Sequence, residues 1–468
     1  MNNNKEFIKS FSGVILNGDR RIVFTSTDFL FRFMSEKCYG EGNGKDKCYL
    51  EPDAEGFIYG LTHGGRQIAI NIGKKKIELY HVVLYQAKYF LIAEQNIINP
   101  IRIEEFQYDT ITLCNGSLRH ILYPIVMDYS KMDRDGFPQK LICDRTYSIG
   151  KHSVSSLRIY STTTEGLSDK NGISKYTNSC MDIKLIKRCS LGGFYAIYRR
   201  VITLLSFLIY SKYIAFDKIL LTDSDNKHGK GIIVYYDSAI NKYENLHGYN
   251  CIHFEQLDSK VVSNLFGNII DNKNQPVINF DLFKEIDESP FYIDNSGAYE
   301  LISCIEREYG LQRENIKNIE DTSVNVLIKN TKCLIKNFRK SNPNAITERT
   351  YNLIYGSINH WRISVAAKLK LLLNKYEEVL LNFMDMLDYN FINEANIEKD
   401  VGILIKYRNG LIHRDSQGEL SKPDPIFCFV VLGILYCSIL DRSGCEMSKI
   451  KELLTYEFFN KFTQSKLY

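Results

Sequence analysis

The chain has 468 residues, of which 44% are hydrophobic and 24% are charged, and its formal net charge is +4 at pH 7. This composition is that of a folded, soluble protein and excludes a disordered chain, while so small a net charge does not by itself indicate a nucleic-acid partner. The length allows two or three domains with a sizeable core.

The amino terminus, Met1 to Glu6, lacks the charged and then apolar layout of a secretory signal, so we expect a cytoplasmic protein. The first half of the chain then predicts mainly sheet. Asn17-Gly18 separates two apolar runs and predicts a hairpin. A helix is predicted after Gly192-Gly193, at 194–213, because apolar residues recur there at helical spacing. The predicted strands are 14–16, 22–24, 57–61, 67–72, 77–85, 219–221 and 232–236.

From about residue 295 the pattern becomes helical. The predicted helices are 297–309, 324–339, 347–359, 365–387, 397–407, 425–440 and 447–462. The near-uncharged run 426–440 has 15 residues, fewer than the ~20 that span a bilayer, so we expect a buried helix and no membrane partner. The predicted fold class is α+β: a β-rich regulatory domain with an inserted helix at 1–294, followed by an all-α bundle at 295–468.

The cysteines and histidines do not predict a metal centre. Twelve cysteines are scattered without a C-x-x-C pair, and neither they nor the histidines follow the spacing of a zinc site. We therefore expect reduced thiols, no structural metal and no cofactor. The polar loop at Asp223 and Asp225 could hold a metal, but a plain surface turn fits it better because no further carboxylate or histidine converges on it by sequence.

Positive charge is concentrated in the second half. Residues 329–376 contain ten Lys or Arg and a single acid, Glu348. Helical spacing gathers five of these cations along one face, which is either a solvated helix surface or a surface that attracts phosphates. The five residues of this predicted RNA-binding face are Lys329, Lys332, Lys336, Arg339 and Lys340.

The residues with the clearest chemical potential follow this basic region. Arg408, Asn409 and His413 place a permanent cation, an amide and a titratable imidazole within six residues, between two apolar helical segments. Arg145 and His152 have a similar spacing, but they lie in a β-patterned, turn-rich region and lack the Arg-Asn dipeptide. We therefore assign the candidate active site to the first set.

The Arg-Asn-x-x-x-His sequence resembles the Arg-x4-6-His motif of the HEPN superfamily, and the domain order resembles the ApeA-like anti-phage HEPN proteins. Residues 301–309 are similar to the first helix of that family's bundle, and 368–381 to the helix that precedes the motif helix. The resemblance implies a metal-independent endoribonuclease of the HEPN type that acts in antiviral defence by abortive infection. It also implies a homodimer through the HEPN domain, RNA as substrate with tRNA among the candidates, and a phage-derived trigger at the N-terminal domain.

These residues suit metal-free RNA cleavage. An imidazole titrates near neutral pH and can act as base or acid, and a guanidinium stabilises charge that develops on the phosphate. Asn409 and His413 share a helix face, so Asn409 is the predicted orienter. Glu306 or Glu378 could support Arg408, although an ion pair on the surface or within the bundle fits each of them better. Arg414 either extends the phosphate surface or caps the helix.

Two other functions remain open at this point. The chain could be a HEPN module that binds nucleotide, RNA or a partner without cleaving. It could also be a metal-dependent nuclease that uses Asp223 and Asp225, although a clustered acid-acid-lysine pattern is missing from the sequence.

Overall fold

The structure is a computed structural model. It forms two compact units, Met1–Gly267 and Asn268–Tyr468, which we describe separately. The residues that the structure describes are 10–17, 20–35, 48–79, 82–94, 103–118, 127–132, 138–140, 144–168, 172–209, 214–225, 231–236, 252–270, 276–278, 295–312, 319–343, 345, 347–358, 365–386, 399–407 and 424–458.

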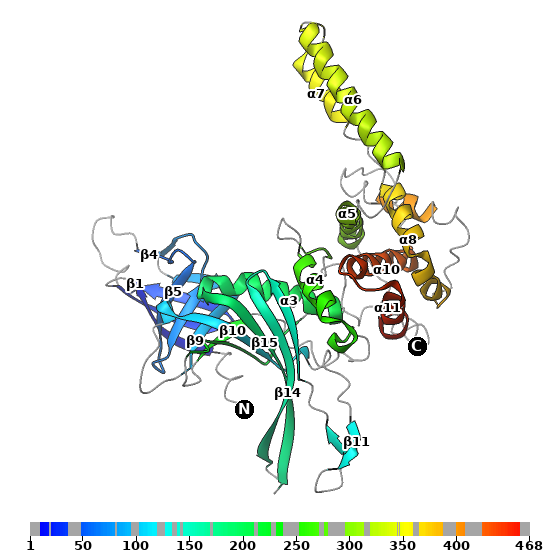
Figure 1. Ribbon diagram of the computed structural model, residues 1–468. Helices are drawn as coiled ribbons and strands as arrows, with labels where there is room; N and C mark the ends of the chain where they lie inside the picture. The colour runs from blue at the N-terminus through cyan, green and yellow to red at the C-terminus, as the bar shows by residue number, and fades with distance from the viewer. Residues whose placement is uncertain are drawn as a thin grey trace, which may run out of the picture. The chain divides into compact units, whose positions relative to one another are not determined.

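The first unit is built on a 13-stranded antiparallel sheet with the order β13-β14-β15-β10-β16-β17-β9-β6-β5-β1-β2-β3-β8 (Figure 1). Two small sheets accompany it, β11-β12 and β4-β7. The strands are β1 (Ser10–Asn17), β2 (Arg20–Thr27), β3 (Leu30–Ser35), β4 (Cys48–Leu50), β5 (Phe57–Thr62), β6 (Gln67–Asn71), β7 (Ile77–Leu79), β8 (Val82–Gln86), β9 (Tyr89–Ala93), β10 (Gln107–Cys114), β11 (Met127–Met132), β12 (Pro138–Lys140), β13 (Asp144–Lys151), β14 (Val154–Ser168), β15 (Gly172–Ser190), β16 (Lys218–Thr222) and β17 (Gly231–Tyr236).

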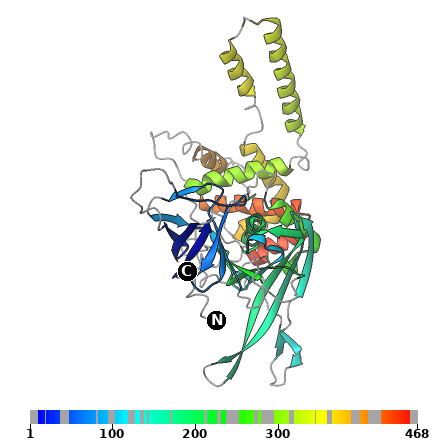
Figure 2. The ribbon, with the colours of Figure 1, turned by 90° about the vertical axis from the view of Figure 1, so that its left-hand side faces the viewer.

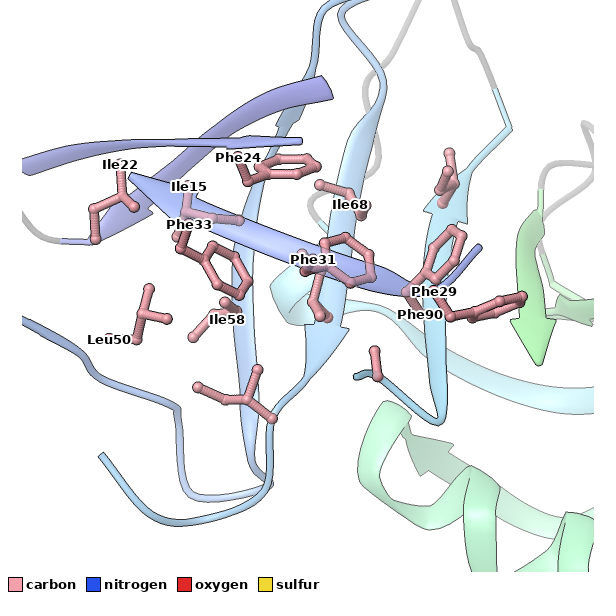
Figure 3. Close-up of a cluster of buried hydrophobic side chains, with 14 of the residues drawn as sticks. Ile15, Ile22, Phe24, Phe29, Phe31, Phe33, Leu50, Ile58, Ile68 and Phe90 are labelled. Atoms are coloured by element: carbon pink, nitrogen blue, oxygen red, sulfur yellow. The ribbon is translucent and has the colours of Figure 1, made fainter. Parts of the chain in front are cut away.

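Alternating side chains on β1–β3 create one core of this unit. Phe31 and Phe33 are fully buried while Arg32 between them is exposed, as the two-residue period of a strand requires. Phe24 joins them from β2 and Phe90 from β9, and the rings lie 5.5 to 6.3 Å apart (Figure 3). Strands β1 and β5 approach closely here, since a Cβ at Gly60 would lie 2.3 Å from the carbonyl oxygen of Val14.

A second core lies where two helices, α3 (Phe194–Ile209) and α4 (Ser259–Asn268), pack on the sheet. Tyr198 of α3 contacts the ring of Tyr236 at 4.9 Å. Arg200 is buried and donates to the carbonyls of Phe266 at 3.0 Å and Gly267 at 3.2 Å, which satisfies carbonyls at the end of α4. The inserted helix that the sequence predicted is therefore α3, whereas α4 was not predicted.

The second unit is helical. Its elements are α5 (Asn295–Gln312), α6 (Ile319–Ser341), α7 (Glu348–Ser357), α8 (Val365–Met386), α10 (Pro425–Arg442), α11 (Met447–Glu452) and a π-helical segment η9 (Leu453–Phe458), and residues 399–407 are also helical. The centre is formed by α5, α8 and α10, which pack on one another through fully buried residues such as Leu372 and Leu435. The α+β fold class predicted from the sequence is thus confirmed.

Helices α6 and α7 run side by side (Figures 1 and 2). The guanidinium of Arg339 lies 4.2 Å from the centre of the Tyr351 ring, and the ammonium of Lys332 lies 5.1 Å from that of Tyr355. Each cation–π contact of this kind contributes roughly 0.5–1 kcal/mol at an exposed site. Basic side chains of α6 therefore take part in holding α7.

The boundary between the units precedes the one that the sequence predicted at 294/295. Val277 donates its backbone N–H to Ile269 at 2.9 Å, and Arg442 of α10 donates to the carbonyl of Asn268 at 3.4 Å. The first bond joins residues within the segment that follows Gly267, and the second attaches Asn268, its first residue, to the helical unit. The sequence-based boundary was placed where helical periodicity begins, so it left this segment in the first domain. Residues 279–294 lie outside the described part of the chain.

Candidate active site

The structure describes the helix that precedes the motif but not the motif residues themselves. Arg408, Asn409, His413 and Arg414 lie outside the described residues. Residues 399–407 are helical, and Val401, Leu404 and Tyr407 are buried. Their spacing of three residues puts them on one helix face, so the segment enters the motif with an apolar face packed inside its unit.

The two glutamates considered as supports for Arg408 occupy different environments. Glu306 of α5 forms an ion pair with Lys368 of α8, with 3.3 Å between carboxylate and ammonium. Lys368 also lies over the ring of Tyr309, 5.9 Å from its centre. Glu378 is exposed on α8. Glu306 therefore links two helices of the bundle, which is the ion-pair alternative considered for it from the sequence.

A buried carboxylate that the sequence analysis missed lies two residues further along α5. Glu308 is completely buried and pairs with Arg442 of α10, with 2.9 Å between Oε1 and Nε. Ser438 donates its hydroxyl to the same carboxylate oxygen at 3.1 Å. A buried charge is tolerated only when it is paired and hydrogen-bonded, and both conditions are met here.

One turn later along α5, a second polar cluster joins this helix to both α8 and α10. Gln312 donates its amide to the Tyr376 hydroxyl at 2.9 Å and to the Ser438 carbonyl at 2.7 Å. Lys375 donates to the Gln312 amide oxygen and to Asp441, each at 2.7 Å. Burial, and secondarily the charge of Asp441, raise the pKa of the Tyr376 phenol. The phenol therefore stays protonated and donates to Asp441 at 2.9 Å.

These clusters hold α5, α8 and α10 in one register. Every polar atom named above has a partner, and a fully satisfied buried network stabilises one packing arrangement rather than offering a reactive group. A sequence signal for them exists: Leu301, Cys304, Glu308 and Gln312 follow one another at spacings of three or four residues, so the two polar residues continue the buried face of α5.

The predicted RNA-binding face divides into two parts. Lys329, Lys336 and Lys340 are exposed on α6, whereas Lys332 and Arg339 are half-buried against the tyrosines of α7. Arg339 also lies 3.9 Å from the carboxylate of Glu348. The three exposed lysines are therefore the ones free of these α7 contacts, and they present their charges to solvent.

Asp223 and Asp225 are the residues of the alternative, metal-dependent site, and their surroundings differ from those of a metal centre. Arg188 of β15 forms ion pairs with both carboxylates, at 2.9 Å with Asp223. Asp223 also accepts the backbone N–H of Asp225 at 3.2 Å. Within the described ranges, no group of three or more His, Cys, Asp or Glu side chains is arranged to hold a metal ion. The ion pairs with the Arg188 guanidinium and the hydrogen bond between Asp225 and Asp223 are typical of a surface turn.

Arg145 and His152, the second pair with a suitable spacing, are placed by a β-hairpin. Arg145 lies on β13 and donates to the carbonyl of Glu255 at 3.4 Å. His152 lies in the turn between β13 and β14 with φ +49°, and burial, with the charge of Arg200, lowers its pKa. Their spacing therefore reflects a turn and not a helical active site.

One helical stretch, Leu191–Ile209, has the length and apolar content of a membrane span, but 67% of that window is buried within the protein. Its packing on the sheet is typical of a core helix. Comparison of the chain with protein-family models, curated proteins and solved structures found no match.

Proposed function

We propose that the chain is a metal-independent endoribonuclease of the HEPN type, similar to the ApeA-like proteins, that acts in anti-phage defence. The observation that carries the proposal is the Arg408-Asn409…His413 sequence directly after a helix whose apolar face is buried. That helix belongs to the helical unit, which has α5, α8 and α10 at its centre. A catalytic site needs rigid elements of this kind to hold its side chains in position.

In this proposal His413 removes the proton from a ribose 2′-hydroxyl, and the resulting alkoxide attacks the neighbouring phosphorus. The bond from phosphorus to the 5′-oxygen breaks, and an imidazolium returns a proton to that oxygen. The products are a 2′,3′-cyclic phosphate and a 5′-hydroxyl. Proton transfer of this kind typically contributes about 10²- to 10⁴-fold, and Arg408 stabilises the charge on the phosphate through its planar guanidinium.

A single chain contributes one motif histidine, whereas the reaction needs a base and an acid. We therefore propose a homodimer through the helical unit, in which two copies of His413 and Arg408 form one cleft. Asn409, four residues before His413 in the sequence, orients the imidazole or the phosphate. The exposed lysines of α6 and Arg414 attract the RNA backbone, with tRNA among the candidate substrates.

The β-rich unit is proposed to sense a phage-derived trigger and to restrain cleavage in its absence. Cleavage of host RNA then stops growth of the infected cell, which is abortive infection. The site of action is the cytoplasm, where both RNA and phage products occur.

The deciding experiment incubates the purified chain with total RNA in the presence of EDTA and maps the ends that are formed. Wild type should produce 2′,3′-cyclic phosphates, and His413→Ala should produce none while its oligomeric state and melting temperature stay unchanged. His63→Ala is the matched control, because His63 is an exposed histidine in the turn between β5 and β6. Equal cleavage by wild type and His413→Ala would refute the catalytic assignment.

The alternative function is a HEPN module that binds RNA without cleaving it, and the exposed basic residues of α6 favour it. In that case wild type retains RNA, forms no cyclic phosphates, and is as toxic in cells as His413→Ala. Cleavage that EDTA abolishes would instead point to a metal-dependent nuclease.

A further inference from the structure

Two cysteines face each other across neighbouring strands of the first unit. Cys114 ends β10, and Cys180 is its direct partner in the antiparallel pairing with β15. Both are thiols, and their sulfur atoms are 3.4 Å apart. Directly opposite residues in such a pair have Cα atoms about 4.5–5.5 Å apart, which lies inside the range of about 4.4–6.8 Å that a disulfide spans. The backbone therefore already has the spacing of a disulfide.

The strand register at this point is held on both sides of the cysteines. On one side Leu113 opposes Met181, and both side chains are fully buried. On the other side Asn115 donates its backbone N–H to Ser179 at 2.6 Å, and its side-chain oxygen accepts the N–H of Ser179 at 3.1 Å. A slip by one residue would expose the buried pair, so the thiols stay opposed.

The chain also turns sharply after the pair. Asn115 and Gly116 have φ angles of +55° and +57°, and a Cβ at Gly116 would lie 2.2 Å from the carbonyl oxygen of Ala215. Glycine is therefore required at this position. The turn fixes the end of β10, and with it the position of Cys114.

The two thiols differ in accessibility. Cys114 is half-buried, whereas Cys180 is only 5% exposed. Cys114 therefore offers more surface to a small molecule in solution than Cys180 does. This is the arrangement of an attacking cysteine with a resolving partner.

We propose that Cys114 and Cys180 form a dithiol modification site that a low-molecular-weight disulfide oxidises to an intramolecular disulfide. The Cys114 thiolate attacks one sulfur of the reagent, which forms a mixed disulfide and releases one thiol. Cys180 then loses its proton and attacks the Cys114 sulfur, which forms the Cys114–Cys180 bond and releases the second thiol. The protein loses two hydrogen atoms, and the reagent is reduced to two thiols.

The surroundings of the Cys114 thiol slow its oxidation but do not prevent it. The hydrogen bond with Cys180 and burial raise the pKa of the Cys114 thiol, and Asp182 acts in the same direction while Lys218 opposes it. Tyr160 of β14 lies opposite Cys180 on its other side and adds no positive charge. Only a small fraction of Cys114 is thiolate at neutral pH, so brief exposure to an oxidant leaves the site reduced.

Oxidation would join residues 66 positions apart in the chain, at the end of the β10–β15 pairing. A cross-link over so long a loop restricts the unfolded chain and so stabilises the folded unit. The oxidised protein should show a higher melting midpoint and slower amide exchange in β10 and β15. Cytoplasmic disulfides are mostly transient and redox-sensing, and a slowly reacting dithiol with one half-buried cysteine fits that use.

The test incubates the folded full-length chain with oxidised glutathione, blocks remaining thiols by alkylation, and measures intact and peptide masses. Wild type should lose two hydrogen atoms and yield a cross-linked peptide that contains Cys114 and Cys180. Cys180→Ser should instead accumulate the glutathione adduct on Cys114. Cys189→Ser is the matched control, because Cys189 is a half-buried thiol on the same strand that has Tyr108 opposite it, and it should form the cross-link like wild type.

Two results would overturn the proposal. One is the absence of the Cys114–Cys180 peptide in wild type that retains its native melting midpoint. The other is a cross-link that forms only after denaturant is added, or that joins either cysteine to another of the twelve with equal yield. RNA cleavage does not enter these readouts, so the outcome is independent of the proposed function.

Discussion

Glu308 has no exposure to solvent, and Arg442 supplies most of the interactions that stabilise its charge. The guanidinium donates to both carboxylate oxygens, at 2.9 and 3.3 Å, and the Arg442 side chain is 14% exposed. Removing one partner of such a pair leaves an uncompensated buried charge, which costs about 3–5 kcal/mol, although the intact pair contributes much less than that. The pair is therefore sensitive to single substitutions.

We expect Arg442→Ala to lower the free energy of unfolding of the helical unit by about 3–5 kcal/mol. Hydrogen exchange of amides in α5 and α10 measures this loss in that unit alone. Lys449→Ala is the control, because Lys449 pairs with Glu452 at 2.9 Å on the surface, with side chains 34% and 54% exposed. Exposed pairs contribute about 0–1 kcal/mol, so equal losses in the two variants would contradict a buried-charge effect.

The candidate site shows how far residue types and spacing carry a prediction. Arg408, Asn409 and His413 were identified because guanidinium, amide and imidazole are chemically distinctive and close in sequence. Glu308 was missed and Glu306 was chosen instead, because both are glutamates in one helix and only the partners on α8 and α10 distinguish them. Those partners are remote in sequence, with Arg442 134 positions from Glu308.

At the scale of elements, α10 was the most predictable helix. Its apolar run is too short for a bilayer, and Phe427 to Leu440 are almost completely buried. Pro425 occupies the first turn, where its missing N–H costs nothing, and the Asp424 side chain accepts the N–H of Ile426 at 2.8 Å. Local signals thus define where this helix begins.

Asp424→Ala should destabilise α10 by about 1 kcal/mol, because the N–H of Ile426 loses its acceptor, while Asp424→Asn should change its stability little. Amide exchange in the first turn of α10 is the measurement. Glu446 is the matched control, since it occupies the N-cap of α11 without a side-chain cap bond, and Glu446→Ala should have almost no effect. Similar effects at both caps would show that the Asp424 contact is not the cause.

Elements that depend on remote partners were harder to predict. Strands β14 and β15 pair over residues 154–185, and neither was assigned from the sequence, although Asn171-Gly172 between them is the same hairpin signal as Asn17-Gly18. The predicted strand at 77–85 is two strands, β7 and β8, that belong to different sheets. The predicted helix at 447–462 begins as α11 and continues as π-helix from Leu453. In the last two cases the pairing or packing partner, and not the local pattern, decides the outcome.

At the scale of the whole molecule, the position of charge matters more than its sum. The net charge of +4 is small, yet residues 329–376 hold ten cations and one acid. Each phosphate neutralised on single-stranded nucleic acid contributes about −0.7 to the slope of log affinity against log salt. The exposed lysines of α6 should therefore control how RNA binding responds to salt.

We expect combined Lys329→Gln, Lys336→Gln and Lys340→Gln to weaken RNA binding and to reduce the magnitude of that slope by about 2. Fluorescence anisotropy of a labelled RNA across a salt series gives the slope. The control replaces Lys74, Lys75 and Lys76 by Gln, which removes the same charge from exposed lysines of the first unit. If both triple variants change the slope equally, only net charge matters and the α6 surface is not the binding site.

The sequence by itself determined the α+β class, the order of a β-rich region, an inserted helix and a helical region, and the start of α10, and it supplied the motif residues as candidates. These depend on hydrophobic period, turn and cap residues and side-chain chemistry, all of which are encoded within a few neighbouring positions. The tertiary structure alone decided the 13-strand order, the unit boundary, the Glu308–Arg442 pair and the opposed thiols of Cys114 and Cys180. Each of these joins residues far apart in the chain, and only packing selects such partners.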